Sequence, residues 1–170
     1  GLAYQGFLSA NRRPGSAIFI LQLASNQAVQ VSDAAGRNSY TYPSWHPMKR
    51  LLLVTSHEIT PPSIYLLDPD SREMSLVTEG QDAVWSPDGT RMAFVRGGDV
   101  WIRDLHDEEL QITNYGNCYE PSWSPDGSRL VFSSTRLGNQ DIYVINADGT
   151  AERRITNSTA FDYSPSWSPW

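Results

Sequence analysis

The stretch EPSWSPDGSRLVF, residues 120–132, holds a tryptophan, a Pro-Asp-Gly turn and an apolar run in close succession. The same order of residue types occurs in WSPDGTRMAF from Trp85 and in PSWHPMKRLLLV from Pro43, and the sequence ends on PSWSPW from Pro165. Self-similarity of this kind is the sequence signature of repeat architectures. The fold must therefore be derived from the repeated unit.

Three groups of positions keep step along the chain. Tryptophans at intervals of 40, 38 and 44 residues form the first group: Trp45, Trp85, Trp123 and Trp167. Triplets of aromatic and β-branched residues form the second, starting at Ile18, Ile64, Val100 and Ile142. The third closes each unit with an apolar residue followed by Ser or Thr, at Val31, Val77, Ile112 and Ile155. Because three independent groups stay in register over four copies, the repetition cannot be accidental.

Each unit contains the signals of four short strands. The first strand carries the tryptophan and ends at a Ser-Pro-Asp-Gly turn, residues 86–89 and 124–127, where Pro presets φ and Gly accepts a positive φ. Apolar runs such as 92–95 form the second strand, and the other two groups of positions form the third and fourth. Helical periodicity is absent. Four strands per repeat predict an all-β fold, a β-propeller of four-stranded antiparallel blades.

The two ends of the chain split one unit between them. The units run roughly over 1–33, 43–79, 83–114 and 121–157, with a closing strand at 163–170. The first unit lacks a tryptophan strand and the last piece is a tryptophan strand alone, so the chain holds four blades' worth of strands. We expect the N- and C-terminal strands to close one blade, which removes an open sheet edge. Three arrangements satisfy this: a four-bladed ring, an eight-bladed ring in which two chains exchange strands, or a slice of a larger propeller.

The composition excludes several classes of function. A net charge of −6 argues against binding to nucleic acid or anionic membranes, which need basic patches. The single cysteine, Cys118, cannot form an internal disulfide. No apolar run approaches the ~20 residues of a membrane span, so we expect no membrane insertion.

The residues that carry chemistry are sparse. No Gly-x-Ser-x-Gly nucleophile elbow is present, and the three histidines fall at different positions of different units. The Asp-containing hairpins offer fewer oxygens than the six to eight that calcium needs, and we expect Asp88 and Asp126 to bond to turn amides. The sequence therefore predicts no catalytic residue, no metal site and no cofactor.

The unit from Trp123 to Asn157 closely resembles the repeat of TolB-type β-propellers. It has their pattern of Trp-Ser-Pro-Asp-Gly, an apolar strand, Asp-Ile-Tyr, Asp-Gly and Arg-Ile-Thr. The unit from Trp85 matches in its first half, the unit from Trp45 has His-Pro-Met-Lys in place of the turn motif, and the first unit matches only in strand pattern. The resemblance implies a non-catalytic module that binds partner proteins, in the periplasm or outside the cell.

Two other functions stay open, because a fold does not fix a function. Similar repeats form the propeller domains of prolyl-oligopeptidase-like serine peptidases, so the chain could be a fragment of such an enzyme. The start and stop inside a blade also suggest an excised or engineered propeller fragment without independent activity.

A binding surface is expected where the copies differ. Loops between the fourth strand of one blade and the first strand of the next should meet on one face with the loops between second and third strands. The former are rich in tyrosines, with acids beside them near the central opening. The candidate binding residues are Tyr40, Tyr42, Glu79, Asp82, Tyr119, Glu120, Asp162 and Tyr163. Aromatic side chains are typical anchors of interfaces, although these tyrosines could equally pack between blades.

The charges on this face favour a protein partner. The acids form a set that could hold a cation or receive a basic peptide. A basic set lies on the loops between second and third strands: Arg12, Arg13, Arg96 and Arg136. Charge of both signs on one face suits a protein better than a nucleic acid. In the two-chain ring, a second copy of the chain would also be a partner, as a homodimer formed by strand exchange.

Overall fold

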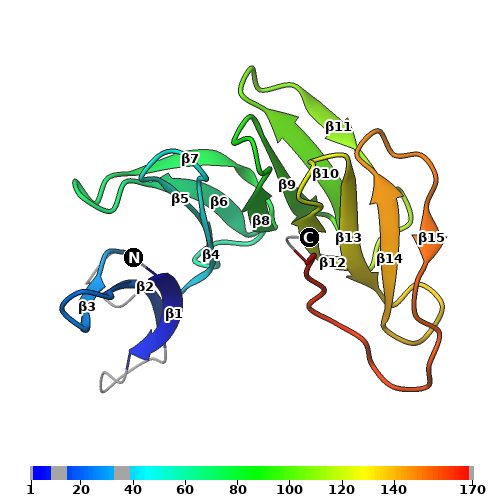
Figure 1. The fold of residues 1–170 in the computed structure, drawn as a ribbon, viewed down its shortest axis with the longest axis horizontal. Helices are drawn as coiled ribbons and strands as arrows, with labels where there is room; N and C mark the ends of the chain where they lie inside the picture. The colour runs from blue at the N-terminus through cyan, green and yellow to red at the C-terminus, as the bar shows by residue number, and fades with distance from the viewer. Residues whose placement is uncertain (1, 9–14, 33–38, 169–170) are drawn as a thin grey trace. The chain divides into compact units, whose positions relative to one another are not determined.

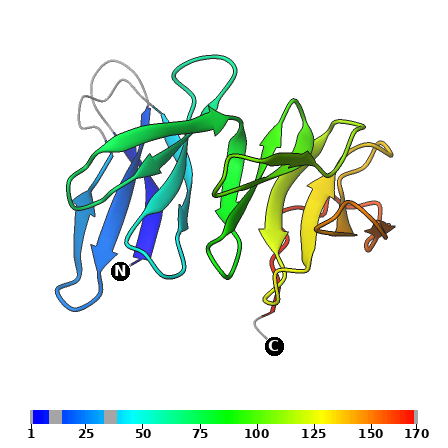
Figure 2. The same ribbon diagram turned by 90° about the horizontal axis from the view of Figure 1, so that it is seen from above.

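The computed structural model describes residues 2–8, 15–32 and 39–168, and its regular elements are all β-strands (Figure 1). No helix in this part of the chain could cross a membrane. The chain divides into two compact units, Gly1–Ala83 and Val84–Trp170. In each of them the strands follow one another as antiparallel meanders (Figures 1 and 2). The prediction of an all-β fold with four-stranded antiparallel blades is confirmed.

The first unit contains one sheet of three strands and one of four. The first sheet has the order β1-β2-β3, and its strands are β1 (Leu2–Leu8), β2 (Gly15–Gln22) and β3 (Gln27–Gln30). The second has the order β4-β5-β6-β7, and its strands are β4 (Tyr40–Trp45), β5 (Leu52–Ser56), β6 (Ser63–Leu67) and β7 (Met74–Glu79). Ile18 and Ile20 from β2 share a buried core with Leu52 and Val54 from β5.

The second unit follows with two four-stranded sheets, the first of which begins at β8, just before the boundary. The first sheet has the order β11-β10-β9-β8, and its strands are β8 (Gln81–Trp85), β9 (Arg91–Arg96), β10 (Asp99–Asp104) and β11 (Glu109–Gln111). The second has the order β12-β13-β14-β15, and its strands are β12 (Cys118–Trp123), β13 (Arg129–Ser134), β14 (Asp141–Asn146) and β15 (Arg153–Arg154). Their shared core includes Val100, Phe132 and Tyr143, together with the free thiol of Cys118.

The strand pairing shows which positions of the four repeats correspond. The second and third strands of the four sheets pair at matching positions: Ala3 with Ile20, Leu53 with Leu66, Ala93 with Ile102 and Val131 with Val144. These are the same positions that align in the sequence. β1 is therefore the second strand of its blade, and no strand in the described part of the chain pairs with its other edge.

The Ser-Pro-Asp-Gly turns are held by their own side chains. The Ser86 hydroxyl donates to Asp88 Oδ1 (2.6 Å), which also accepts the Thr90 amide (3.0 Å). Asp126 does the same in the next repeat, accepting the Ser124 hydroxyl (2.6 Å) and the Ser128 amide (3.0 Å). The predicted role of both aspartates is confirmed.

In the repeat that lacks the Ser-Pro-Asp-Gly motif, His46 accepts the hydrogen bonds that hold the turn. Its side chain is buried, and Nδ1 accepts the amides of Met48 (3.1 Å) and Lys49 (3.0 Å). A neutral imidazole nitrogen is an acceptor like a carboxylate oxygen. The turn is therefore kept although its sequence has changed.

The closing strand expected at 163–170 is not formed within residues 163–168, and residues 169–170 lie outside the described residues. A strand exists only where a neighbouring edge accepts its hydrogen bonds, and no described strand pairs with this segment. Closure of a blade by the two ends of the chain stays a prediction.

Candidate functional site

The first strand of each repeat has the same backbone irregularity. A residue three positions before each repeat tryptophan has a positive φ: Tyr42 (51°), Asp82 (56°), Glu120 (53°) and Ser164 (51°). The strand pairing shifts register at this place in β4 and in β12. Such bulges redirect a side chain, and positive φ is uncommon for residues other than glycine. Three of these four residues belong to the predicted binding set, and Ser164 was missed.

In the first unit, the predicted residues differ in their access to solvent. Tyr42 is 47% exposed and Glu79 is also exposed. Asp82 is buried, and its amide donates to Thr55 Oγ1 (3.2 Å). Tyr40 is only 5% exposed and packs in the core of the unit, so its assignment to a contact surface is wrong. The start of β4 turns this side chain inward.

In the second unit, Tyr163 is 65% exposed, and Tyr119, Glu120 and Asp162 are half-buried. Glu120 has a defined contact. Its carboxylate accepts the amide of Ser164 (2.7 Å, Oε2) and the hydroxyl of Ser164 (3.1 Å, Oε1). It therefore fixes the bulge of one repeat to the bulge of the next.

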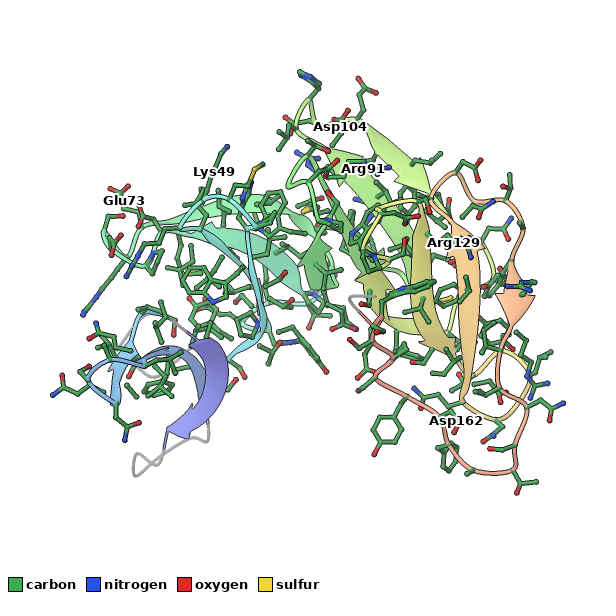
Figure 3. The ribbon with its side chains drawn as sticks, viewed as in Figure 1. Lys49, Glu73, Arg91, Asp104, Arg129 and Asp162 are labelled. Atoms are coloured by element: carbon green, nitrogen blue, oxygen red, sulfur yellow. The ribbon has the colours of Figure 1, made fainter. Side chains whose placement is uncertain are left out.

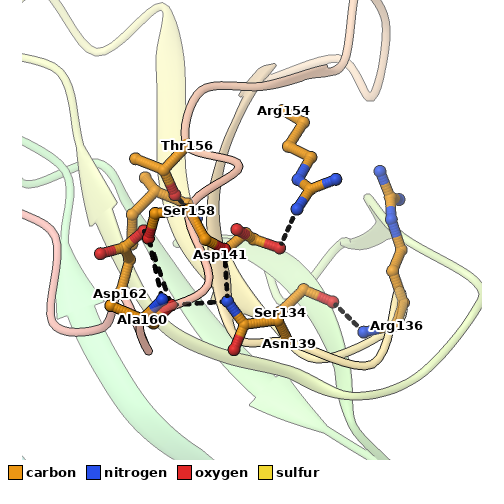
Figure 4. Close-up of polar contacts among 10 residues, drawn as sticks. Ser134, Arg136, Asn139, Asp141, Arg154, Thr156, Ser158, Ala160 and Asp162 are labelled. Carbon is orange, nitrogen blue, oxygen red and sulfur yellow. Dashed lines mark hydrogen bonds and ion pairs between the residues drawn. The ribbon is translucent and has the colours of Figure 1, made fainter.

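We refer to residues 158–168 as the C-terminal strap. Asn139 Nδ2 donates to the carbonyls of Ser158 (2.9 Å) and Ala160 (2.5 Å) at its beginning (Figure 4). Further along, the Asp162 amide donates to the Gln140 carbonyl (2.8 Å). Asp162, labelled in Figure 3, thus lies in a segment held by backbone contacts to the β13–β14 loop.

The tyrosine loop before β12 is ordered by Asp99. Its Oδ1 accepts the Thr113 hydroxyl (3.0 Å) and the amides of Tyr115 (3.0 Å) and Gly116 (2.9 Å). The Tyr115 hydroxyl donates to Glu152 (2.9 Å), and burial raises the pKa of Tyr115 far above its usual value. Tyr115 therefore stays neutral and packs against the core of its own unit.

Two arginines of the predicted basic set have partners inside the chain. Arg96 lies over the ring of Trp101 (4.2 Å to its centroid) and pairs with Glu109 (2.6 Å). Arg136 lies over the ring of Tyr143 (4.1 Å) and pairs with Glu152. Arg12 and Arg13 lie outside the described residues.

The same arrangement, an arginine stacked on an aromatic ring and paired with a glutamate, occurs in both sheets of the second unit. The aromatic residue occupies the same position of the third strand, and each glutamate stands three residues before the isoleucine that closes its repeat. Cation–π contacts of this kind add to an ion pair. The sequence signal was present in these spacings, but the pairing could be recognised only once the strands were side by side.

Arg91 connects neighbouring repeats. Its guanidinium lies 4.7 Å from the Trp123 ring centroid and donates to the Gly127 carbonyl (2.9 Å). Arg129 is the matching residue of the next repeat, and both are labelled in Figure 3. Trp123 therefore packs against the preceding repeat, as the regular spacing of the tryptophans predicts.

The charged and aromatic residues of these loops form hydrogen bonds and packing contacts. The described residues contain no group of three or more His, Cys, Asp or Glu side chains that could hold a metal ion. The carboxylates of Glu120 and Asp162 face hydroxyl and amide groups of the strap. These acids organise the backbone, and Tyr163, which follows Asp162, is exposed.

Residues 82–170 match the family model of the TolB beta propeller domain, which is more than half of the chain. The chain belongs to this family. The Tol-Pal system protein TolB of Anaeromyxobacter dehalogenans strain 2CP-C is 34% identical over 146 residues, which are 84% of this chain and 24% of that protein. The chain thus spans about a quarter of the length of this curated relative.

The solved structures agree on the fold. TolB from Acinetobacter baumannii superposes with a TM-score of 0.77 at 24% identity, over 91% of this chain and 41% of that one. The acylaminoacyl peptidase of Pyrococcus horikoshii superposes with a TM-score of 0.56 at 14% identity, over 69% of this chain and 25% of that one. The resemblance to TolB-type β-propellers is confirmed.

Proposed function

We propose that this TolB-family chain is a non-catalytic protein-interaction module, located in the periplasm or outside the cell. Support comes from the family and from a relative named for the Tol-Pal system. The observation that carries the proposal is the positive φ of the residue three positions before each of the four repeat tryptophans. Strained backbone at corresponding positions persists where the redirected side chains have a task.

Each of the two units would contribute exposed loop residues of its own. Tyr42 and Tyr163 supply aromatic area, which carries much of the binding energy at protein interfaces. Glu79, exposed beside the β7–β8 connection, supplies charge. A partner with basic side chains fits best, because opposite charges orient and accelerate association.

The test is a titration of the purified chain with a purified Pal protein, followed by calorimetry. Tyr163→Ala should weaken the affinity about tenfold, since truncated aromatic anchors commonly cost more than 1 kcal/mol. Leu105→Ala is the matched control, because Leu105 is 57% exposed on the β10–β11 hairpin, at the opposite end of the strands. Absence of binding, or equal losses in both variants, would refute the proposal.

A second candidate is the propeller of a larger serine peptidase, where the chain would admit substrate to a catalytic domain. The fold it shares with the Pyrococcus peptidase supports this candidate. Its test is the reading frame downstream of Trp170, which must continue into a Gly-x-Ser-x-Gly segment. A frame without that segment would eliminate it.

Exchange of strands between two copies would add a homotypic contact to either function.

A further inference from the structure

The loops that follow β11 and β15 begin alike. In both sheets of the second unit the sequence Ile-Thr-Asn closes the repeat, at 112–114 and 155–157. The threonine hydroxyl oxygen accepts the amide of the second residue of the third strand: Val100 to Thr113 (2.9 Å) and Ile142 to Thr156 (3.0 Å). The backbone therefore leaves the two sheets in the same way, and the two loops can be compared position by position from the threonine onward.

The aspartate that opens the third strand is also held alike through its Oδ2 atom. The residue before the closing isoleucine donates to it: Gln111 Nε2 to Asp99 (3.3 Å) and Arg154 to Asp141 (2.6 Å, Figure 4). The Oδ1 atoms differ. Asp99 Oδ1 has its three donors, whereas Asp141 is 0% exposed and its Oδ1 has no hydrogen-bond partner in the described part of the chain. A buried carboxylate oxygen without a donor is unfavourable.

The sequence contains the counterparts of the missing donors. Counted from the threonine, Ser158 and Thr159 correspond to Tyr115 and Gly116, whose amides donate to Asp99. Within the described residues, the amides of Ser158 and Thr159 donate to no acceptor. The segment is held instead by its carbonyls, because Asn139 Nδ2 donates to those of Ser158 (2.9 Å) and Ala160 (2.5 Å) (Figure 4).

We infer that residues 157–160 have a second, closed position, in which the Thr156 hydroxyl and the amides of Ser158 and Thr159 donate to Asp141 Oδ1. Closing releases the two carbonyls from Asn139. Two hydrogen bonds between neutral groups are thus exchanged for three to a carboxylate, and bonds to a charged acceptor are stronger. Since Arg154 already neutralises the carboxylate, neutral donors complete its contacts better than a second cation would.

The length of the loop permits this movement. Seven positions separate Thr113 from Glu120, the positive-φ residue of the next first strand, and eight separate Thr156 from Ser164, its counterpart. The extra residue lets the start of the loop move toward Asp141 while Ser164 keeps its contact with Glu120.

Thr159 explains why the open position is the one in this structure. Its counterpart Gly116 has a φ of 70°, and no atom lies within 4 Å of the place where a Cβ would stand. A side chain would fit there, so the backbone conformation alone favours glycine. Threonine, which is β-branched, resists positive φ. This cost offsets the stronger hydrogen bonds, and the two positions are close in free energy. The strap is therefore anchored at its start either to Asn139 or to Asp141.

The amide proton of Ser158 in the full chain reports the closed position by NMR. A hydrogen bond to a carboxylate moves an amide proton downfield, so its chemical shift follows the closed population. Thr159→Gly should raise the equilibrium constant for closing about tenfold, because glycine adopts positive φ freely. Thr159→Ala is the matched control. It also removes the branched side chain but keeps a Cβ, so it should move the resonance much less.

Asn139→Ala tests the same equilibrium from the open side. It removes both contacts of the open position, so the Ser158 amide should again move downfield, with about a tenfold gain in closing. Asp141→Asn should cancel the shift in both variants. Its oxygen stays toward Arg154, and its NH2 group faces the loop, where it cannot accept an amide.

Far-UV circular dichroism verifies that each variant folds. A Ser158 amide that stays in place in both variants would overturn the inference. The same holds for a shift that persists with Asp141→Asn or is equally large in Thr159→Ala. Because this readout needs no binding partner, its outcome is independent of the titration that tests the proposed function.

Discussion

The sheets β8–β11 and β12–β15 have the same strand arrangement and several equivalent residues, but one equivalent aspartate makes different contacts in each. Both have an arginine over the third-strand aromatic ring and paired with a glutamate. Asp99 and Asp141 open the third strand in both. Asp99 Oδ1 accepts three donors of the β11–β12 loop, whereas Asp141 Oδ1 is buried without a hydrogen-bond partner among the described residues and Oδ2 accepts Arg154 (2.6 Å). The sheet is repeated, but the conformation of the loop after its fourth strand decides which donors the aspartate accepts.

The largest expected effect comes from removing the loop-ordering carboxylate. Asp99→Ala should lower the free energy of unfolding by about 3 kcal/mol, since three donors lose their acceptor at roughly 1 kcal/mol each. Asp141→Ala should cost about half as much, because no donor in the described part of the chain reaches its buried Oδ1. Urea denaturation measures both. Equal losses would mean that Asp141 does hold the 157–162 loop in solution.

The ion pairs should behave alike in the two sheets. A double-mutant cycle on Arg96 and Glu109, and another on Arg136 and Glu152, should each give a coupling of about 1 kcal/mol, the upper range for partly exposed pairs. Arg50 and Asp70 form the control cycle. Their side chains are 61% and 65% exposed, so their coupling should be near zero. A large difference between the first two cycles would show that the two arginine–glutamate pairs do not stabilise their sheets equally.

Acid should affect the two Ser-Pro-Asp-Gly turns equally. Hydrogen bonds from a serine hydroxyl and a backbone amide lower the pKa of Asp88 and of Asp126 to about 2. The unfolded value is about 3.9, so each carboxylate stabilises the fold above pH 4 and loses this contribution as the pH falls toward 2. Asp88→Asn and Asp126→Asn should both flatten the dependence of Tm on pH in this window. Different slopes would separate the two turns.

The smallest global effect is expected at the link between repeats. Glu120→Gln keeps one carbonyl oxygen for Ser164, so the Tm should change little. The Ser164 amide should nevertheless exchange faster with deuterium, because a charged acceptor holds it more strongly than a neutral one. Unchanged exchange would show that the strap is held by its other contacts.

Much of the fold follows from local signals. The tryptophan spacing and the Ser-Pro-Asp-Gly turns act over a few residues, and they predict the sheets and the turn bonds of Asp88 and Asp126. The burial of Tyr40 could not be predicted, because the bulge that follows it decides which way the start of β4 faces. The pairing of Arg136 with Glu152 joins the β13–β14 loop to the β14–β15 loop and needs the assembled sheet. His46 stands at the position of the turn serine but accepts turn amides as the aspartates do, an equivalence that residue type alone does not reveal.

The contacts of Arg91 and of the indoles of Trp123 and Trp167 bear on folding kinetics. Each of them joins one repeat to its immediate neighbour across 36 to 45 residues of sequence, so each contact closes a loop of about one repeat and none of them spans the whole chain. The entropic cost of closing a loop grows with its length, so these contacts cost less than one that joins the two ends of the chain. A nascent chain can therefore secure each blade when the next tryptophan leaves the ribosome, without waiting for the last one.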